Sequence, residues 1–404
     1  MKLVDPSYCT GCGACIQSCP RKAISYTVDT EGFPTPIIDN GLCVNCRLCE
    51  KVCPALHMPQ TNIIQTAYAA QILDADALKK STSGGLFTIF SRETFRRGGV
   101  VFGCVWDKDY RAYITEATSE MEIEPMRGSK YVWSHAGDMF PRVKAYLEQG
   151  KNVLFSGLPC QIAGLRNYLN KDYNGLLLLD FLCSGTPSPL ALDKYLETIC
   201  KLKDRTNLNL KFRDKEPYGL GVHITYNGQK KRTAKRGESI SNSYYYSFYS
   251  HLIDRQCCYK CPYGTEKRIS DLTMSDFWGI ERYHPEMNIS AGVSALLVNT
   301  NKGAQFLAAV EDQVTLVRSS PENIGRANNL DVNGKQRNKP VPENRKPFFV
   351  ELRESGWKSA ERKYLFTTTR LKKLIKVKTP RKFSRLIRKI RKLVRLTKKE
   401  RSTC

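Results

Sequence analysis

The sequence predicts an α+β protein, in which a short cysteine-rich block precedes a larger domain of mixed α/β structure. Eight of the sixteen cysteines fall within residues 1–57, in two copies of one spacing pattern. Residues 67–350 alternate short apolar runs with stretches of helical periodicity, as expected when helices cover a sheet. The 404 residues are enough for two or three domains, and a composition of 41% apolar and 25% charged residues is ordinary for a globular protein.

The N-terminal block contains an internal repeat with the spacing C-x-x-C-x-x-C-x-x-x-C-P. The two copies are Cys9, Cys12, Cys15, Cys19, Pro20 and Cys43, Cys46, Cys49, Cys53, Pro54. This is the pattern of bacterial ferredoxins with two [4Fe-4S] clusters. The tight loop lets three thiolates point at three corners of one cubane. The fourth cysteine is expected to open a short helix that reaches the other cluster.

This crossover predicts two sets of four ligands. One cluster is held by Cys9, Cys12, Cys15 and Cys53, and the other by Cys19, Cys43, Cys46 and Cys49. The alternative is zinc, but four-cysteine zinc modules usually pair two C-x-x-C units across a longer gap. Residues 23–26 and 35–38 resemble the hairpin strands of a ferredoxin, joined through Glu31 and Gly32. We therefore predict a bacterial-type 2[4Fe-4S] ferredoxin fold for residues 1–57.

The larger domain is predicted to span residues 67–350, after a linker at 58–66. Strands are expected at 99–103, 152–156, 176–181 and 295–298. Continuous apolar runs of this length suggest strands that are buried on both faces. Helices are expected at 136–149, 161–169 and 189–202. The order of the strands in the sheet does not follow from the sequence.

Eight cysteines lie outside the N-terminal block, and four of them stand in distinctive positions. Cys160 lies between a strand and a helix, Cys183 ends the next strand, and Cys258 and Cys261 form a C-x-x-C unit. These four could converge at one edge of the sheet and hold a third cluster, with Cys257 as an alternative to Cys258. The other interpretations are buried structural thiols and a redox-active dithiol. No cofactor role is expected for Cys104, Cys200 and Cys404.

Three further segments have the composition of ligand-binding loops. Ser-Thr-Ser-Gly-Gly at 81–85 precedes an apolar helix, and a hydroxyl cap with two glycines would expose free amides to a phosphate or ring carbonyl. Gly-Ser-Lys-Tyr at 128–131 combines a glycine, a hydroxyl, a cation and an aromatic ring. Phe-Arg-Asp-Lys at 212–215 could clamp an anionic ligand. Taken singly, each segment is also explained as a helix cap, a surface turn or a solvated strand end.

Six motifs in the same order give the chain a family resemblance. They are the segments at 81–85, 128–131 and 212–215, Gly-Leu-Pro-Cys-Gln-Ile-Ala-Gly-Leu at 157–165, Cys-Tyr-Lys-Cys-Pro at 258–262 and Ser-Asp-Phe-Trp-Gly at 275–279. Over roughly residues 1–300, the chain resembles the family of the coenzyme F420 hydrogenase/dehydrogenase beta subunit, with a two-cluster ferredoxin fused in front.

The resemblance implies that the larger domain binds a flavin, FAD. This flavin would exchange hydride with a small organic substrate, a deazaflavin or another compound, and single electrons with the clusters. The implied flavin contacts are Ser83, Gly84, Gly85, Ser129, Lys130 and Tyr131. The implied ligands of a third [4Fe-4S] cluster are Cys160, Cys183, Cys258 and Cys261. Lys130 and Lys215 are the candidates for binding charged groups, and no catalytic acid or base stands out.

Residues 370–404 form a basic tail with sixteen Lys or Arg and one Glu, which is +15 of the net charge of +25. Within 380–399, apolar residues recur at helical spacing among the cations, and this pattern favours an anionic membrane surface. The alternatives are a helix docked on a partner, an RNA-binding arm and a disordered tail. The remainder of the chain has no recognisable nucleic-acid-binding motif, which argues against nucleic acid as a partner.

The cysteine pattern and the lack of long apolar runs bear on location. No run reaches the roughly 18 residues of a membrane span, and no signal-peptide core is visible. Dense, regularly spaced cysteines in a reducing compartment point to metal binding. We therefore expect a cytoplasmic protein, with the tail allowing peripheral contact with the inner face of the membrane.

The sequence therefore predicts an iron–sulfur flavoprotein oxidoreductase. It would pass electrons between ferredoxin-type clusters, a flavin and a small organic substrate, with another protein as electron donor or acceptor. The alternative is an electron-transfer subunit that has no substrate chemistry of its own and serves a partner enzyme. The large second domain argues against this alternative, because a carrier alone needs only a ferredoxin-sized block.

Overall fold

This computed structural model describes residues 3–200, 205, 207–215, 221–226, 228–234, 242–326, 328, 330–332 and 339–366. The predicted tail at 370–404, with its expected helix at 380–399 and Cys404, lies outside these residues. The side chain of Cys200 is also outside the description. Among the described helices, none combines the length and the apolar character needed to cross a membrane.

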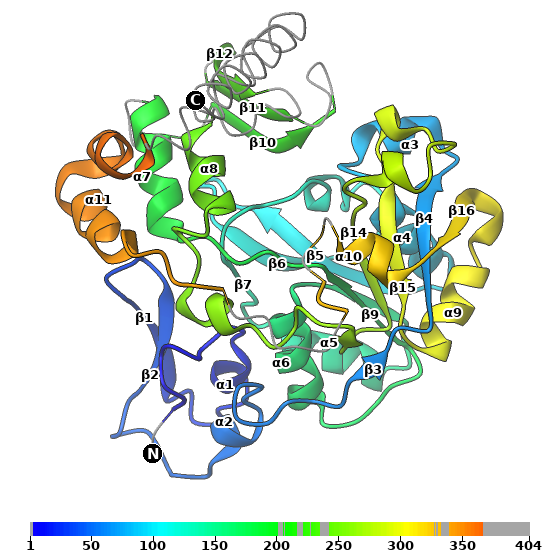
Figure 1. Cartoon of the computed structure of the whole chain (residues 1–404). Coiled ribbons are helices and arrows are strands. Elements are labelled where there is room, and N and C mark those ends of the chain that lie inside the picture. Colours follow the sequence, from blue (N-terminus) through cyan, green and yellow to red (C-terminus); the bar gives the residue numbers. More distant parts are fainter. Residues whose placement is uncertain are drawn as a thin grey trace, which may run out of the picture.

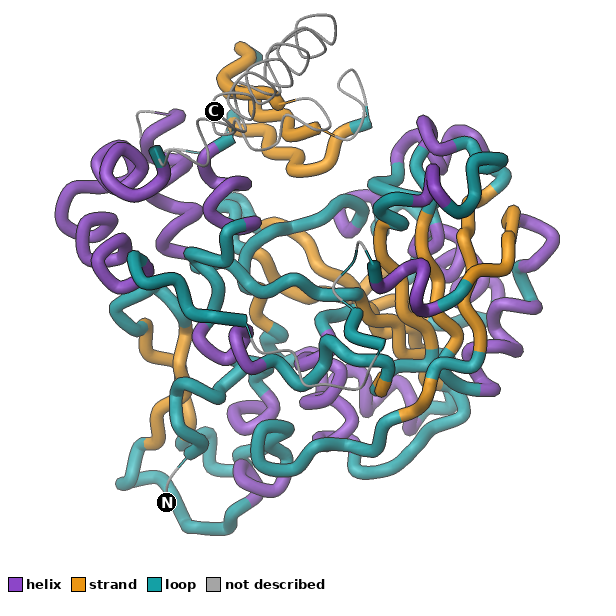
Figure 2. The backbone as a smooth tube through the Cα atoms, viewed as in Figure 1, coloured by secondary structure: helices purple, strands orange, loops and turns teal. Residues whose placement is uncertain are grey.

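The N-terminal block, blue in Figure 1, consists of two one-turn helices and a hairpin. The helices are α1 (Ala14–Gln17) and α2 (Leu48–Lys51), and most of the remaining block is loop (Figure 2). Strand β1 (Ile24–Val28) pairs antiparallel with β2 (Pro34–Ile38), with Ile24 opposite Ile38. The predicted hairpin is confirmed, and so is its turn at Glu31 and Gly32.

The segment at 58–66 is more than a linker. It contains β3 (Asn62–Ile63), which pairs antiparallel with β13 (Lys267–Arg268). The side chain of Arg166 also donates a hydrogen bond to the carbonyl oxygen of Gln60, over 2.6 Å. These contacts fasten the connection to the large body.

The large body is built on a nine-stranded sheet. Its strands, in their order across the sheet, are β16 (Val314–Ser319), β4 (Thr66–Ile72), β15 (Ser294–Val298), β14 (Leu272–Asp276), β9 (Leu176–Phe181), β8 (Val153–Ser156), β5 (Val100–Trp106), β6 (Ala112–Ala117) and β7 (Ser134–His135). The predicted strands at 99–103, 152–156, 176–181 and 295–298 correspond to β5, β8, β9 and β15 and are confirmed. The strands β5, β8, β9 and β14 run parallel to one another.

The parallel strands are buried on both faces, as their apolar runs predict. In β8, Val153 and Phe155 pack into one core, whereas Leu154 between them packs into another. Helices α5 (Met139–Glu148) and α6 (Pro159–Leu169) contribute to the first core. Helices α3 (Ala75–Lys80), α4 (Leu86–Arg96) and α9 (Asn301–Ala308) contribute to the second. The sheet is therefore the middle layer between two sets of helices (Figure 1).

The predicted helices at 136–149, 161–169 and 189–202 are confirmed as α5, α6 and α7 (Pro189–Cys200). A third core joins α7 to α8 (Ser243–Tyr249), α11 (Arg345–Ala360) and the separate sheet of β10 (Leu208–Asp214), β11 (Gly221–Tyr226) and β12 (Gln229–Ala234). The remaining short elements are η1 (Glu124–Met126), η3 (Gln256–Lys260), η4 (Ile280–Arg282), η5 (Ile289–Ala291), η6 (Glu311–Gln313), α10 (Pro321–Gly325) and η7 (Glu361–Leu365).

The N-terminal block is docked on the body through its hairpin turn. The carboxylate of Glu31 forms an ion pair with both terminal nitrogens of the Arg345 guanidinium, at the start of α11. Gly32 lies against Leu190 of α7 so closely that a Cβ at this position would overlap the leucine. The hydroxyl of Ser188 donates a hydrogen bond to the Glu31 carbonyl oxygen over 2.5 Å. The hairpin therefore fixes the ferredoxin block relative to α7 and α11.

Candidate functional site

The two cysteine repeats have the same backbone conformation. Gly11 and Gly13 in the first copy have φ values of 69° and 81°, and Asn45 and Arg47 at the matching positions of the second copy have 54° and 60°. Left-handed backbone at these positions turns each loop tightly between successive cysteines. Glycine adopts this conformation without strain, and asparagine tolerates it better than most residues. The internal repeat of the sequence is thus also a repeat of the fold.

The position of the cysteines relative to the helices corrects the sequence expectation. The cysteine spacing predicts that the fourth cysteine of each repeat opens a short helix, but α1 and α2 contain the third cysteines, Cys15 and Cys49. Cys19 and Cys53 follow these helices. The reason is that the left-handed residues Gly13 and Arg47 serve as the N-caps, so each helix starts before the third cysteine.

Each set of the crossover scheme surrounds a separate cavity. The first cavity is lined by Cys9, Cys12, Cys15 and Cys53. The second is lined by Cys19, Cys43, Cys46 and Cys49, of which Cys49 also borders the first. Burial raises the pKa of the Cys12 thiol to about 12, so a bound metal must compensate for ionising it. The donor set, four thiols around each space, fits a cubane.

The third set of cysteines converges, as its positions in the sequence suggested. Cys160 lies in the first turn of α6, and Cys183 follows the end of β9. Both line a cavity of about 410 Å³ together with Cys257, Cys258 and Cys261. No three Cys, His, Asp or Glu side chains in the described parts of the chain are arranged to share one metal ion. A cubane differs in this respect, because each of its four irons takes a separate thiolate.

The lining of this cavity comes from both parts of the chain. Tyr8, Thr10 and Pro54 of the N-terminal block face it, as do Cys160 and Cys183 of the body. The cavity therefore lies between the ferredoxin block and the carboxyl ends of strands β8 and β9. In open sheets with parallel strands, this edge is the usual place for ligands.

The other cysteines lie apart from this cavity. Cys104 is within β5 and half-buried, and burial raises the pKa of its thiol. Cys200 is the last residue of α7. Neither lines any of the three cavities described above.

The loop at 81–85 is held against the start of β15. Its Ser83 hydroxyl donates to the carbonyl oxygen of Val293 over 2.9 Å, and the amide of Gly84 donates to the Ser294 hydroxyl over 2.9 Å. The expected hydroxyl cap of α4 is therefore wrong: the N-cap is Gly85, with φ of 85° and no side-chain hydrogen bond. Gly84 allows this packing, because a Cβ there would lie 2.7 Å from the Ser294 nitrogen.

The loop at 128–131 lies next to the loop at 81–85. A Cβ at Gly128 would be 3.8 Å from the hydroxyl oxygen of Thr82. The ammonium of Lys130 is directed at the backbone, and it donates to carbonyl oxygens at 2.8–3.1 Å, those of Pro125, Met126, Arg127 and Gly128. Burial lowers the pKa of Lys130 to about 8. Its contacts in this structure shape the loop. The Tyr131 ring packs edge-on against Phe212 and Tyr245.

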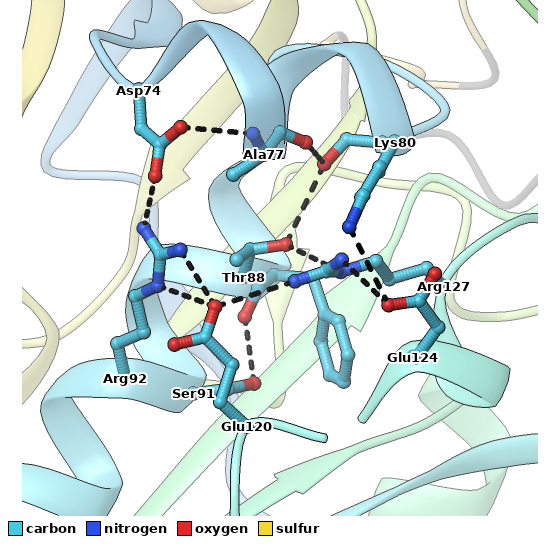
Figure 3. Close-up of polar contacts among 11 residues, drawn as sticks. Asp74, Ala77, Lys80, Thr88, Ser91, Arg92, Glu120, Glu124 and Arg127 are labelled. Carbon is cyan, nitrogen blue, oxygen red and sulfur yellow. Dashed lines mark hydrogen bonds and ion pairs between the residues drawn. The ribbon is translucent and has the colours of Figure 1, made fainter. Parts of the chain in front are cut away.

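A polar network holds these two loops in register (Figure 3). The Arg127 guanidinium donates to the Thr88 hydroxyl over 3.2 Å and lies 3.6 Å from the carboxylate of Glu124. Arg92 links Asp74, the N-cap of α3, to Glu120, with distances of 2.8 and 2.6 Å. The segments that flank both loops are thereby tied to helix α4.

Arg213 and Lys215 complete this site from β10. The guanidinium of Arg213 pairs with Asp276 over 2.6 Å and lies over the ring of Trp278, 5.0 Å from its centroid. Its side chain is only 3% exposed, yet the nitrogens Nε and NH2 have no hydrogen-bond partner. The ammonium of Lys215 donates to the carbonyl oxygens of Leu78 and Ser83, over 2.5 and 2.8 Å. The hydroxyl of Thr82 is likewise buried without a partner.

These unpaired donors have a physical meaning. Buried polar groups are nearly always hydrogen-bonded, so unpaired donors mark a place where a ligand supplies the acceptors. The sequence motif at 212–215 indicated an anion clamp, and Arg213 has the position for it. Two other buried polar residues, Arg255 and Tyr263, lie beside the cysteine cavities without having been singled out from the sequence; their closeness to the cysteines at 257–261 was the available signal.

Two family models match the chain. Residues 8–56 match the 4Fe-4S dicluster domain, and residues 150–323 match the C terminus of the coenzyme F420 hydrogenase/dehydrogenase beta subunit. One component of the F(420)H(2) dehydrogenase from Methanosarcina mazei is 21% identical over 226 residues, which are 52% of this chain and 63% of the relative. The coenzyme F420-dependent sulfite reductase of Methanocaldococcus jannaschii is 24% identical over 197 residues, 48% of this chain and 30% of the relative.

Another relative matches the N-terminal block alone. The ferredoxin-like protein in the nif region of Rhizobium leguminosarum bv. trifolii is 38% identical over 61 residues, which are 14% of this chain and 83% of the relative. Among solved structures, the F420-reducing [NiFe] hydrogenase complex from Methanosarcina barkeri has a chain with a TM-score of 0.43 and 15% identity, covering 64% of this chain and 84% of that one. The chain spans less than two thirds of the two methanogen relatives given above.

The matched residues include the ferredoxin repeat and the motifs from 157 to 279, apart from the two N-terminal loops at 81–85 and 128–131. The chain therefore belongs to the family of the coenzyme F420 hydrogenase/dehydrogenase beta subunit, and it has a 4Fe-4S dicluster domain at its N-terminus.

Proposed function

We propose that the chain is an iron–sulfur flavoprotein oxidoreductase, which passes electrons between its N-terminal clusters, a third cluster, a flavin and a small organic substrate. The observation that supports this most directly is the cavity of the third cysteine set. Its lining combines Tyr8 and Pro54 of the ferredoxin block with Cys160 and Cys183 of the body. A redox group in this position would connect the two parts of the molecule.

The ligands proposed for the third cluster are Cys160, Cys183, Cys258 and Cys261. Five cysteines line the cavity, so one of the neighbours Cys257 and Cys258 is left over. A hydrogen bond from the Cys257 thiol lowers the pKa of Cys258, and the Thr186 hydroxyl lies 3.4 Å from the Cys258 sulfur. Both contacts favour the thiolate form of Cys258, which is the form that binds metal. Cys258 is therefore the better ligand of the two.

The proposed flavin site consists of the two adjoining loops and the β10 cations. The flavin contacts would be Ser83, Gly84, Gly85, Ser129, Lys130 and Tyr131. The unpaired donors of Thr82 and Arg213 fit this assignment, because the pyrimidine edge and the phosphates of FAD are rich in acceptors. When bound, FAD supplies the exchange of an electron pair with the substrate and of single electrons with the clusters. The chain's own part is to bind and orient it with these loops.

The relatives suggest the class of substrate and partner. Both methanogen relatives have F420 in their names, and one of them is a component of a multi-subunit dehydrogenase. A deazaflavin is therefore the first substrate to test, and a redox protein is the proposed partner. The name of the dehydrogenase component also favours the alternative function, in which the chain is an electron-transfer subunit that serves a partner enzyme and has no substrate chemistry of its own.

Flavin content separates the two functions. The full chain would be purified without oxygen, and its flavin released with acid and quantified by chromatography with fluorescence detection. The oxidoreductase predicts about one FAD per chain, bleaching of the flavin spectrum by a reduced substrate, and subsequent reduction of the clusters. Protein that contains its iron and sulfide but neither retains nor rebinds FAD would contradict the oxidoreductase and leave the electron-transfer subunit.

A further inference from the structure

Arg255 of the large body reaches into the ferredoxin block. It directly precedes η3 and is 3% exposed. Its Nε donates to the carbonyl oxygen of Cys9 over 2.7 Å, and its NH2 donates to the carbonyl oxygen of Pro34 over 2.9 Å. The guanidinium also lies over the ring of Phe33, 5.4 Å from the centroid. A residue far along the chain thus contacts a cysteine of the first cluster site directly.

The third nitrogen of this guanidinium is unoccupied. NH1 is buried and has no hydrogen-bond partner. It lies beside Gly11, where a Cβ would be 3.0 Å from NH1 and 3.2 Å from Cζ. Gly11 therefore leaves room for the guanidinium within the loop that bears Cys9 and Cys12. A free N–H beside these cysteines can donate to a sulfur atom.

The positive charge of Arg255 lacks a carboxylate partner. Among the described residues, no Asp or Glu forms an ion pair with it; the preceding Asp254 is paired with His251 over 2.8 Å. Burial alone would lower the pKa of Arg255, but the nearby Cys9, Cys257 and Cys258 raise it above its usual value. Opposite charge close to Arg255 therefore comes from thiolates of the cluster sites.

We propose that Arg255 raises the reduction potential of the cluster held by Cys9, Cys12, Cys15 and Cys53. Reduction adds a negative charge to a buried group, and an uncompensated cation in the same low-dielectric region stabilises the reduced form. Net charge nearby and hydrogen bonds to the sulfurs are among the factors that set cluster potentials. The cavity of the second set is lined by a different arginine, Arg21, which is exposed. The effect should therefore be confined to the first cluster.

The proposal depends on the N-terminal dicluster domain and on neither the third cluster nor the flavin. Arg255→Gln and Arg255→Met would be compared with wild type by redox titration without oxygen, followed by electron paramagnetic resonance, in protein with an unchanged iron content. The signal of the second cluster is identified by its change in Cys46→Ser. We expect the first cluster to become at least tenfold harder to reduce, which is about 59 mV for one electron. The second cluster serves as the internal reference.

Two further variants control for charge and structure. Arg353→Gln removes an exposed cation that donates to the Thr30 carbonyl oxygen at the same docking surface, and it should leave both potentials unchanged. Arg255→Lys keeps the charge and should stay within about 59 mV of wild type. Fully loaded neutral variants with unaltered potentials would overturn the proposal. If neither neutral variant loads its iron, a drop of more than about 59 mV in a fully loaded Arg255→Lys would overturn it instead.

Discussion

Gly164 of helix α6 packs directly against Cys12 of the ferredoxin block. A Cβ at Gly164 would lie 2.9 Å from the Cys12 sulfur and 3.1 Å from its Cβ. The same helix begins with Pro159 and Cys160, so one helix contacts a cysteine of the first set and contains a cysteine of the third. The contact explains why the motif at 157–165 requires a small residue at this position.

Gly164→Ala should therefore disturb the first cluster. The added methyl group must displace Cys12 or α6, and such overpacking costs about 1–3 kcal/mol of stability. We expect weaker retention of iron at the first site, seen as loss of its resonance signal during dilution without oxygen. Ala163→Gly is the matched control, because it weakens the same helix by about 1 kcal/mol without contacting Cys12. Equal retention of the first cluster in wild type and Gly164→Ala would contradict this packing argument.

The ion pair of Glu31 and Arg345 should stabilise the docking of the ferredoxin block. The Arg345 side chain is 5% exposed and that of Glu31 is 22% exposed. Removing one partner of a fully buried pair costs about 3–5 kcal/mol, and this partly exposed pair should lose about 2 kcal/mol in Glu31→Gln. Trp133 is a suitable fluorescent reporter because its ring meets Tyr26 of the block edge-on, with centroids 5.9 Å apart.

The double variant tests whether the two residues act as a pair. Glu31→Gln together with Arg345→Gln should be less destabilising than the sum of the two single variants, because both lose the same interaction. The measurement is the urea dependence of tryptophan fluorescence in all four proteins. Strict additivity of the two changes would show that the ion pair does not couple the block to α11.

Thr82→Val should separate stability from flavin binding. The Thr82 hydroxyl is buried without a partner, so its removal should leave the flavin-free protein as stable as before or more stable. If FAD accepts a hydrogen bond from this hydroxyl, its affinity should fall about fivefold, or about 1 kcal/mol, in equilibrium dialysis. Thr94→Val on the adjoining helix α4 removes a hydroxyl already bonded to the Phe90 carbonyl oxygen and should leave FAD affinity unchanged. Unchanged affinity in Thr82→Val would remove Thr82 from the site.

Lys215 should lose its proton at an unusually low pH. Burial lowers the pKa of its ammonium to about 8, with Arg213 acting in the same direction and Asp276 against it. As the pH rises through about 8, the amine becomes neutral and its charge is no longer available to an anionic ligand. Trace acetylation as a function of pH, read by peptide mass spectrometry, should show half-maximal labelling of Lys215 near pH 8. A midpoint near the usual lysine value of about 10.4 would contradict this.

The sequence was sufficient wherever the signal is local. The spacing of the cysteines predicts the two loops of the ferredoxin block, because each loop is closed by its own left-handed residues. The strands at 152–156 and 176–181 follow from apolar runs long enough to be buried on both faces. The hydroxyl cap at Ser83 failed for a non-local reason: Val293, more than two hundred residues away, accepts the bond from its hydroxyl.

The features that the sequence did not show depend on tertiary contacts. The placement of β14 between β9 and β15 brings Asp276 to the edge where Arg213 meets it. The docking of the hairpin on α7 and α11 creates the cavity shared by Tyr8 and Cys160. Arg255 has no motif of its own, and its role emerges only when its bond to Cys9 is seen.

Iron content tests the central claim most directly. The full chain, prepared and reconstituted without oxygen, should contain about twelve iron and twelve sulfide per chain, which is four per cubane in three sites. A variant with both Cys183→Ser and Cys261→Ser should contain about eight, with the two N-terminal clusters retained. Wild-type protein that holds only eight irons, unchanged by this double substitution, would contradict the third cluster, and iron-free protein would contradict the whole account.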